Sequence, residues 1–154
     1  MISARLVQLI ESNGEQIIDR MVAQIRREPE MIQTRSLLDH ELREWGQDLL
    51  HNLGHWLSAG NEQDLALRYE RLGKLCFEQG IPLHEAVRGL SVLREKMLDL
   101  AEEYLISNSS VELYAEEELD RRLGRFFDLL IVHLVRGFEQ AIRKVAVVSH
   151  AAGR

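Results

Sequence analysis

Apolar residues recur every three to four positions along nearly the whole chain, the spacing that places them on one face of an α-helix. Strand-like alternation is brief wherever it occurs. The pattern predicts five main helices, over residues 3–27, 36–57, 62–79, 82–104 and 109–148, with Ser3 and Ser109 suited to cap the first and the last. We therefore expect an all-α fold, a bundle of these helices.

The second predicted helix has the most regular apolar face. Its apolar residues are spaced three or four apart: Leu38, Leu42, Trp45, Leu49, Leu53 and Trp56. The first predicted helix contains Asn13-Gly14, where we expect it to kink or split.

The chain shows no internal repeat and no linker composition. We expect a single domain over residues 1–154, with residues 149–154 as a flexible tail. The helix lengths fit both a globin-related arrangement and a simple antiparallel bundle, so the order of packing stays open.

The fifth predicted helix is apolar on more than one face between Phe126 and Val135. Such a helix lies at the centre of a bundle or is shared with a second chain. The residues predicted to form this core or dimer seam are Phe126, Phe127, Leu130, Leu134 and Phe138.

Charge and cysteine content narrow the class of protein. Nineteen basic and 25 acidic residues give a net charge of −6, which argues against a nucleic-acid partner. Cys76 is the single cysteine, so no internal disulfide can form, and its apolar neighbours predict a buried thiol. No apolar stretch is long enough to cross a membrane, and we expect a cytoplasmic protein.

The common catalytic motifs are missing. The chain has no phosphate-binding glycine loop, no nucleophile elbow and no HExxH zinc motif, since His84-Glu85 is followed by Arg88 where the second histidine would stand. We therefore predict no enzyme activity and no catalytic residues.

Two histidines suggest a metal site. His51 and His55 are four residues apart, so they share a face of the predicted helix with Asp48. A solvated polar face explains the same pattern, and we favour it.

His133 is a candidate cofactor ligand, because a lone imidazole among apolar residues can bind haem iron. It is more often a core histidine bonded to a carbonyl or carboxylate. The expectation is therefore no cofactor, with haem as the alternative.

Three arginines and several glycines also draw attention. Arg121, Arg122 and Arg125 follow Glu116–Glu118, which predicts ion pairs along an exposed helix face. Glycines within the predicted helices, such as Gly73 and Gly137, indicate close helix crossings or space for a ligand.

Six segments resemble one known family. They read ELREW (41–45), LL (49–50), LGHWL (53–57), RLGK (71–74), FEQGIPLHEAVR (77–88) and LR (93–94). The sequence is similar to the N-terminal sensory domain of RsbRD-type stressosome co-antagonists, a domain also found ahead of bacterial histidine kinases, over roughly residues 3–145.

The resemblance implies a bacterial, all-α regulatory module, related to domains that look like globins, bind no haem and dimerise. The family's output domain has no counterpart here. We therefore expect either a stand-alone regulator or a piece of a longer chain.

The leading hypothesis is a non-enzymatic sensory module that dimerises and signals through its last helix to a protein partner. The alternative is a ligand sensor with an internal apolar pocket for haem or a lipid-like molecule, with His133 at the ligand. The sequence identifies neither the signal nor the partner.

Overall fold

The computed structural model describes residues 4–58, 60–104 and 110–152, and within them it is helical with no strand. The all-α prediction is confirmed. The helices in chain order are α1 (Ala4–Ser12), α2 (Gly14–Arg27), the 3-10 turn η1 (Thr34–Ser36), α3 (Asp39–Arg43), α4 (Gln47–His51), α5 (Leu53–Leu57), α6 (Glu62–Glu78), α7 (Leu83–Tyr104) and α8 (Ser110–Ala152). The predicted caps Ser3 and Ser109 lie outside the described residues.

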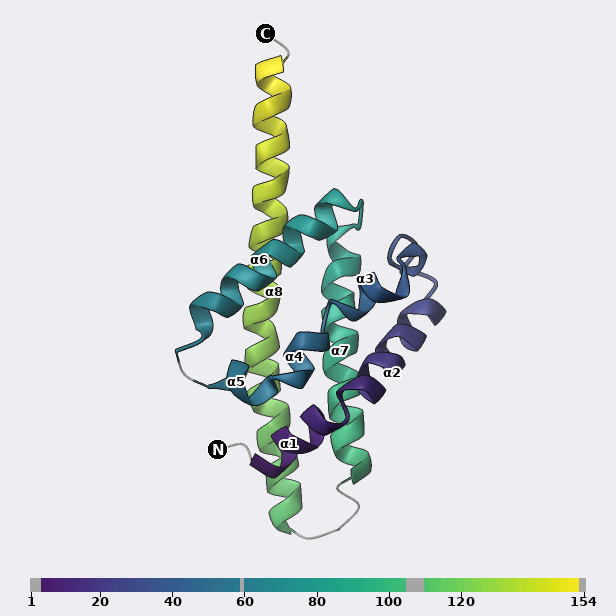
Figure 1. The fold of residues 1–154 in the computed structure, drawn as a ribbon, viewed down its shortest axis with the longest axis vertical. Helices are drawn as coiled ribbons and strands as arrows, with labels where there is room; N and C mark the ends of the chain where they lie inside the picture. Colours follow the sequence, from purple (N-terminus) through teal and green to yellow (C-terminus); the bar gives the residue numbers. More distant parts are fainter. Residues whose placement is uncertain (1–3, 59, 105–109, 153–154) are drawn as a thin grey trace.

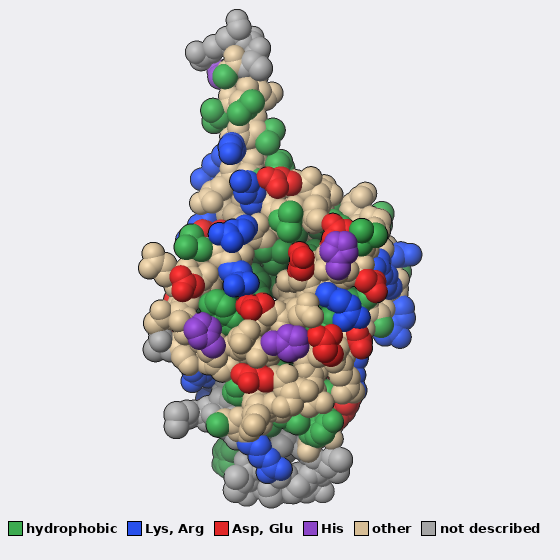
Figure 2. All heavy atoms as spheres, in the orientation of Figure 1, with side chains coloured by type: hydrophobic (Ala, Val, Ile, Leu, Met, Phe, Trp, Pro, Cys, Tyr) green, Lys and Arg blue, Asp and Glu red, His purple; other side chains and the backbone are tan. Residues whose placement is uncertain are grey.

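Helix α8 is the longest element, with 43 residues, and organises the bundle. Helix α6 crosses it, α7 runs beside it, and α2 packs on the other side of α7 (Figure 1). The short helices α3–α5 connect α2 to α6 (Figure 1). The C-terminal end of α8 projects well beyond the rest of the molecule (Figures 1 and 2).

The first predicted helix splits where the sequence indicated. Helix α1 ends at Ser12 and α2 begins at Gly14, and the Asn13 side-chain amide donates to the carbonyl of Leu9 at 2.8 Å. Gly14 lies against His51, since a Cβ at this position would be 3.2 Å from the imidazole Cδ2.

The single helix predicted over residues 36–57 is wrong, because the structure breaks it into α3, α4 and α5. The breaks fall around Gly46 and Asn52, both poor helix formers. The Asn52 amide donates to the carbonyl of Asp48 and so competes with the helical pattern. Leu38, predicted to face inward, is 61% exposed.

Burial along the broken segment nevertheless follows the apolar pattern: Leu42, Trp45, Leu49 and Leu53 are all in the core. The Trp45 ring sits directly on the backbone of α7 at Gly89, where a Cβ would be 2.6 Å from ring atom Cε3. Tertiary packing therefore fixes which residues are inside, even though the helix is interrupted.

A buried carboxylate holds the turn before α3. Glu85, at the start of α7, is 2% exposed, and its Oε1 accepts hydrogen bonds from the backbone N–H of Gln33, the backbone N–H of Thr34 and the Thr34 hydroxyl. These bonds satisfy the buried donors and pin η1 to α7.

Two glycines stand just beyond helix ends in the middle of the chain. Gly80 adopts φ +74° just beyond α6 and Gly60 adopts φ +96° beyond α5, a conformation that glycine takes without steric cost. The fifth predicted helix extends further than expected, since α8 includes residues 149–152 of the predicted tail; residues 153–154 lie outside the described part.

Candidate functional site

Helices α6 and α8 approach until their backbones touch. A Cβ at Gly137 would lie 2.7 Å from the Cα of Glu70, and one at Gly73 would lie 2.9 Å from the backbone N of Phe138. The close-crossing interpretation of these glycines is therefore correct, and α8 has a fixed contact point on α6.

His133 lies beside this crossing. Its Nδ1 is 3.8 Å from Oε1 of Glu70 on α6, and the same oxygen is 3.8 Å from Nη1 of Arg136. The Nδ1 atom is buried and has no hydrogen-bond partner among the described residues. His133 does not line either of the two large cavities described below.

The structure does not bring Asp48, His51 and His55 together as metal ligands. The break at Asn52 removes the continuous helix face on which that prediction rested. His51 instead has its Nε2 3.4 Å from Oε1 of Glu15. Within the described part of the chain, no group of three or more histidine, cysteine or acidic side chains is placed to hold a metal ion.

Asp48 and His55 both contact the side chain of Trp56. Asp48 accepts a hydrogen bond from the indole Nε1 at 3.0 Å, and the His55 ring meets the indole edge-on at a centroid distance of 4.8 Å. Arg68, on α6, lies 5.1 Å from the indole centroid and 3.3 Å from the Asp48 carboxylate. The Trp56 ring is therefore held in place on three sides.

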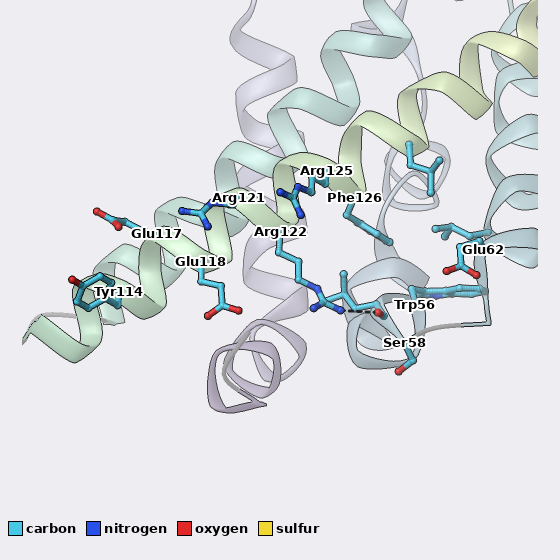
Figure 3. A pocket seen from close by; sticks show the side chains of 13 residues that line it. Trp56, Ser58, Glu62, Tyr114, Glu117, Glu118, Arg121, Arg122, Arg125 and Phe126 are labelled. Carbon is cyan, nitrogen blue, oxygen red and sulfur yellow. Dashed lines mark hydrogen bonds between the residues drawn. The ribbon is translucent and has the colours of Figure 1, made fainter. Parts of the chain in front are cut away.

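Trp56 lines two cavities. The larger, about 780 Å³, lies between α5, the beginning of α6 and the first half of α8 (Figure 3). The second, about 710 Å³, lies on the other side of Trp56, between α4 and α6, with Leu67 and Leu75 at its rim. Leu75 is 37% exposed here.

Arginines line one side of the larger cavity, which the sequence did not predict. Arg122 extends from α8 and donates to the carbonyl of Leu57 at 3.1 Å (Figure 3). Arg121 and Arg125 form no ion pair and no hydrogen bond within the described part of the chain, so the predicted pairs with Glu116–Glu118 are not seen there. Trp56 and Leu65, which also line this cavity, lie far from these arginines in the sequence. Only the folded structure therefore shows that they share a cavity.

The predicted seam residues lie in the core of this one chain. All five are buried: Phe126, Phe127, Leu130, Leu134 and Phe138. Phe138 meets Phe77 of α6 edge-to-face at a centroid distance of 5.5 Å. The seam therefore packs α8 against its own bundle.

Beyond Ala141 none of the described residues covers the helix. Every described side chain from position 142 to 151 is exposed, and Ile142, Val145, Val147 and Val148 are among them (Figure 2). No helix in the described residues is both long and apolar enough to span a membrane.

The comparisons with known proteins gave one match. A family model described as "RsbT co-antagonist protein rsbRD N-terminal domain" matches residues 15–152, which confirms the resemblance carried by the six segments. Neither a curated protein nor a solved structure matches the chain significantly.

Proposed function

Since the chain belongs to the family of RsbT co-antagonist protein RsbRD N-terminal domains, a stressosome-related regulatory family, we propose that it is a non-enzymatic cytoplasmic sensory module. In this proposal two copies pair through the projecting end of α8, and this helix carries the signal to a protein partner. The observation that carries it is the uncovered apolar stripe on that end.

The stripe continues a buried one. Leu134, Phe138 and Ala141 are buried, and Val145 and Val148 follow at spacings of four and three residues. Alternating spacings of three and four are the pattern of a coiled-coil seam. Helix α6 covers the stripe at Phe138, and nothing described covers it at Val145 and Val148, which are 53% and 61% exposed.

A single helix of this kind gains stability by pairing. The projecting part, residues 142–152, has a rise of roughly 16 Å, and an isolated helix of this length is marginal in water. Covering each valine would contribute about 1.5–3 kcal/mol. A second copy supplies an identical stripe, and closed two-fold pairing is the commonest arrangement for such a surface.

The proposed signal depends on the continuity of α8. One unbroken helix lines the larger cavity, crosses α6 at Gly137 and ends in the uncovered stripe. A change in how the bundle packs on its first half therefore alters the position of its free end, where a partner protein would detect it.

The test compares substitutions on and off the stripe. Sedimentation velocity over a concentration series should show a dimer for the unmodified chain and a monomer for the double variant Val145→Glu, Val148→Glu. Val147→Glu is the matched control, because Val147 lies on the opposite face and is 68% exposed. None of the three valines packs in the core, so circular dichroism should show all variants folded.

Two results would contradict the proposal: an unmodified chain that stays monomeric at every concentration, or a double variant that dimerises as well as the Val147→Glu control.

A further inference from the structure

An imidazole nitrogen is left without a hydrogen bond where α6 crosses α8 (Figure 1). The Nδ1 atom of His133 is buried and has no hydrogen-bond partner among the described residues. Oε1 of Glu70, on α6, lies 3.8 Å from this nitrogen, which is beyond hydrogen-bond range. Since buried polar atoms are nearly always bonded, His133 is an exception beside a carboxylate.

The closest backbone approach of the two helices sets the positions of both side chains. A Cβ at Gly137 would lie 2.7 Å from the Cα of Glu70, and His133 precedes Gly137 by one turn of α8. The side chains of His133 and Glu70 are 13% and 21% exposed. A bond between them would require the two groups to close a gap of roughly 1 Å by turning toward each other, since charge-assisted bonds are shorter than the present separation.

The charged groups near His133 come from α6 and from α8 itself. Arg136, on α8, has its Nη1 3.8 Å from the same oxygen of Glu70, but the Arg136 side chain is 54% exposed. Lys74, one turn further along α6, is exposed and forms no ion pair within the described residues. Water therefore screens both of these cations more than it screens the pair of His133 and Glu70.

Helix α7 is the other long helix packed on α8. The charged side chains buried or half-buried in its first two turns are already bonded: Glu85 to Thr34, and Arg88 to Glu28. The carboxylate of Glu70 is therefore the acceptor that an N–H on the His133 Nδ1 would meet.

We propose that His133 and Glu70 form a proton-operated latch between α8 and α6. A neutral imidazole carries one N–H, whereas the cation carries an N–H on both nitrogens. Protonation therefore makes Nδ1 a cationic donor that faces an anionic acceptor, and such charge-assisted hydrogen bonds are about twice as strong as neutral ones. The closed latch ties α6 to α8 beside their backbone contact.

The latch closes as the pH falls. A histidine in an unfolded chain titrates near pH ~6.5. The bond to Glu70 exists only in the folded and protonated state, so it stabilises the fold below about pH 6.5 and is lost as the pH rises. The proton is thereby an input for the sensory module. The inference rests on the proposed function for this role alone, because the latch itself requires no dimer.

The experiment measures urea unfolding by circular dichroism at about pH 5.5 and about pH 8, at fixed ionic strength. The unfolding equilibrium constant should rise with pH, and its ratio between the two conditions should be about tenfold larger for the unmodified chain than for Glu70→Gln or His133→Gln. Tenfold is at the low end for a charged hydrogen bond, because Glu70 is partly exposed and lies near Arg136 as well.

Three substitutions serve as controls. Glu78→Gln and His40→Gln change exposed groups of the same two types outside the latch, so they should keep the tenfold difference. Arg136→Gln should keep it too, because both partners of the latch remain. Independently, nitrogen-15 NMR at about pH 5.5 should show a slowly exchanging Nδ1–H signal for His133 in the unmodified chain, and this signal should be lost in Glu70→Gln.

The proposal is overturned by an equal pH ratio in the unmodified chain and Glu70→Gln, by loss of the difference in Arg136→Gln, or by absence of the slowly exchanging signal. The NMR result on the unmodified chain does not depend on how any variant folds. The Val145→Glu, Val148→Glu variant should show the same tenfold difference. A latch that persists in a chain that never dimerises would contradict only the proposed output.

Discussion

The crossing of α6 and α8 gives a sharp test of the packing described above. Substituting Gly137 by alanine would place a methyl group 2.7 Å from the Cα of Glu70. Ordinary contact of a Cβ begins at 3.4 Å, so the two backbones would have to separate by at least 0.7 Å (3.4 − 2.7). Because the obstacle is backbone, no side chain can rotate to relieve it.

Gly124 provides the matched control. It lies in the same helix, but a Cβ there would have no atom within 4 Å. Alanine is favoured over glycine in a helix interior by about 1 kcal/mol, and this gain applies to both positions. Subtracting the change measured for Gly124→Ala from that for Gly137→Ala therefore isolates the steric cost of forcing the helices apart.

Overpacking of a tightly packed site costs about 1–3 kcal/mol. Gly124→Ala should raise the free energy of unfolding by about 1 kcal/mol, which is a rise in Tm of roughly 2–4 °C for a domain of this size. Gly137→Ala should be less stable than Gly124→Ala by about 1–3 kcal/mol. Urea unfolding followed by far-UV circular dichroism measures both changes.

The reasoning is refuted if the two alanine variants are stabilised equally. Equal stabilisation would mean that the helices do not touch at Gly137, and that the glycine there is not required for their approach. An unchanged dependence of the unfolding free energy on urea concentration, the m value, would show that both variants unfold from comparable compact states.

Two further predictions concern titratable groups. Hydrogen bonds from Arg88 lower the pKa of Glu28 to about 2. The Glu28 carboxylate therefore stays ionised in the folded state at pH values where the unfolded chain, with a pKa near 4.5, takes up a proton. The free energy of unfolding should accordingly fall as the pH falls from about 4.5 to about 2. Glu28→Gln should flatten this acid dependence in urea titrations at several pH values and Glu30→Gln, at an exposed position, should not; equal slopes for all three proteins would contradict the ion pair. Burial raises the pKa of the Cys76 thiol to about 12, and the thiolate is the form that reacts. Cys76 should therefore react with a disulfide reagent only as the chain unfolds in urea. Rapid labelling of the folded protein would be inconsistent with its place in the core.

The sequence predicted burial better than helix continuity. Leu42, Trp45, Leu49 and Leu53 were correctly placed inside by their spacing alone. The segment containing them is nevertheless interrupted at Gly46 and Asn52, and the contact of the Trp45 ring with Gly89 of α7 holds its apolar side in the core. That contact joins distant parts of the chain, so no local pattern could reveal it.

The same limit applies to the candidate sites. His51 and His55 suggested a metal site because spacing on one helix was the only geometry available, and the break at Asn52 gives each of them a different neighbour. Arg121 and Arg125 were predicted to pair with nearby glutamates, whereas in the structure they line the same cavity as Trp56, a residue more than sixty positions earlier. A cavity wall built from two distant segments has no signature in the sequence of either one.

Helix α8 connects the larger cavity with the uncovered stripe. From Arg125 to Gly137 the helix rises roughly 18 Å, and from Gly137 to Val148 roughly 16 Å, at 1.5 Å per residue. The crossing with α6 therefore divides the helix into two arms of similar length, one on the cavity and one carrying the uncovered stripe. The contact there joins backbone to backbone, and buried side chains such as Phe138 against Phe77 pack beside it. The first arm is therefore held within the bundle, and the second arm is the part of α8 on which a partner can pack without disturbing the core.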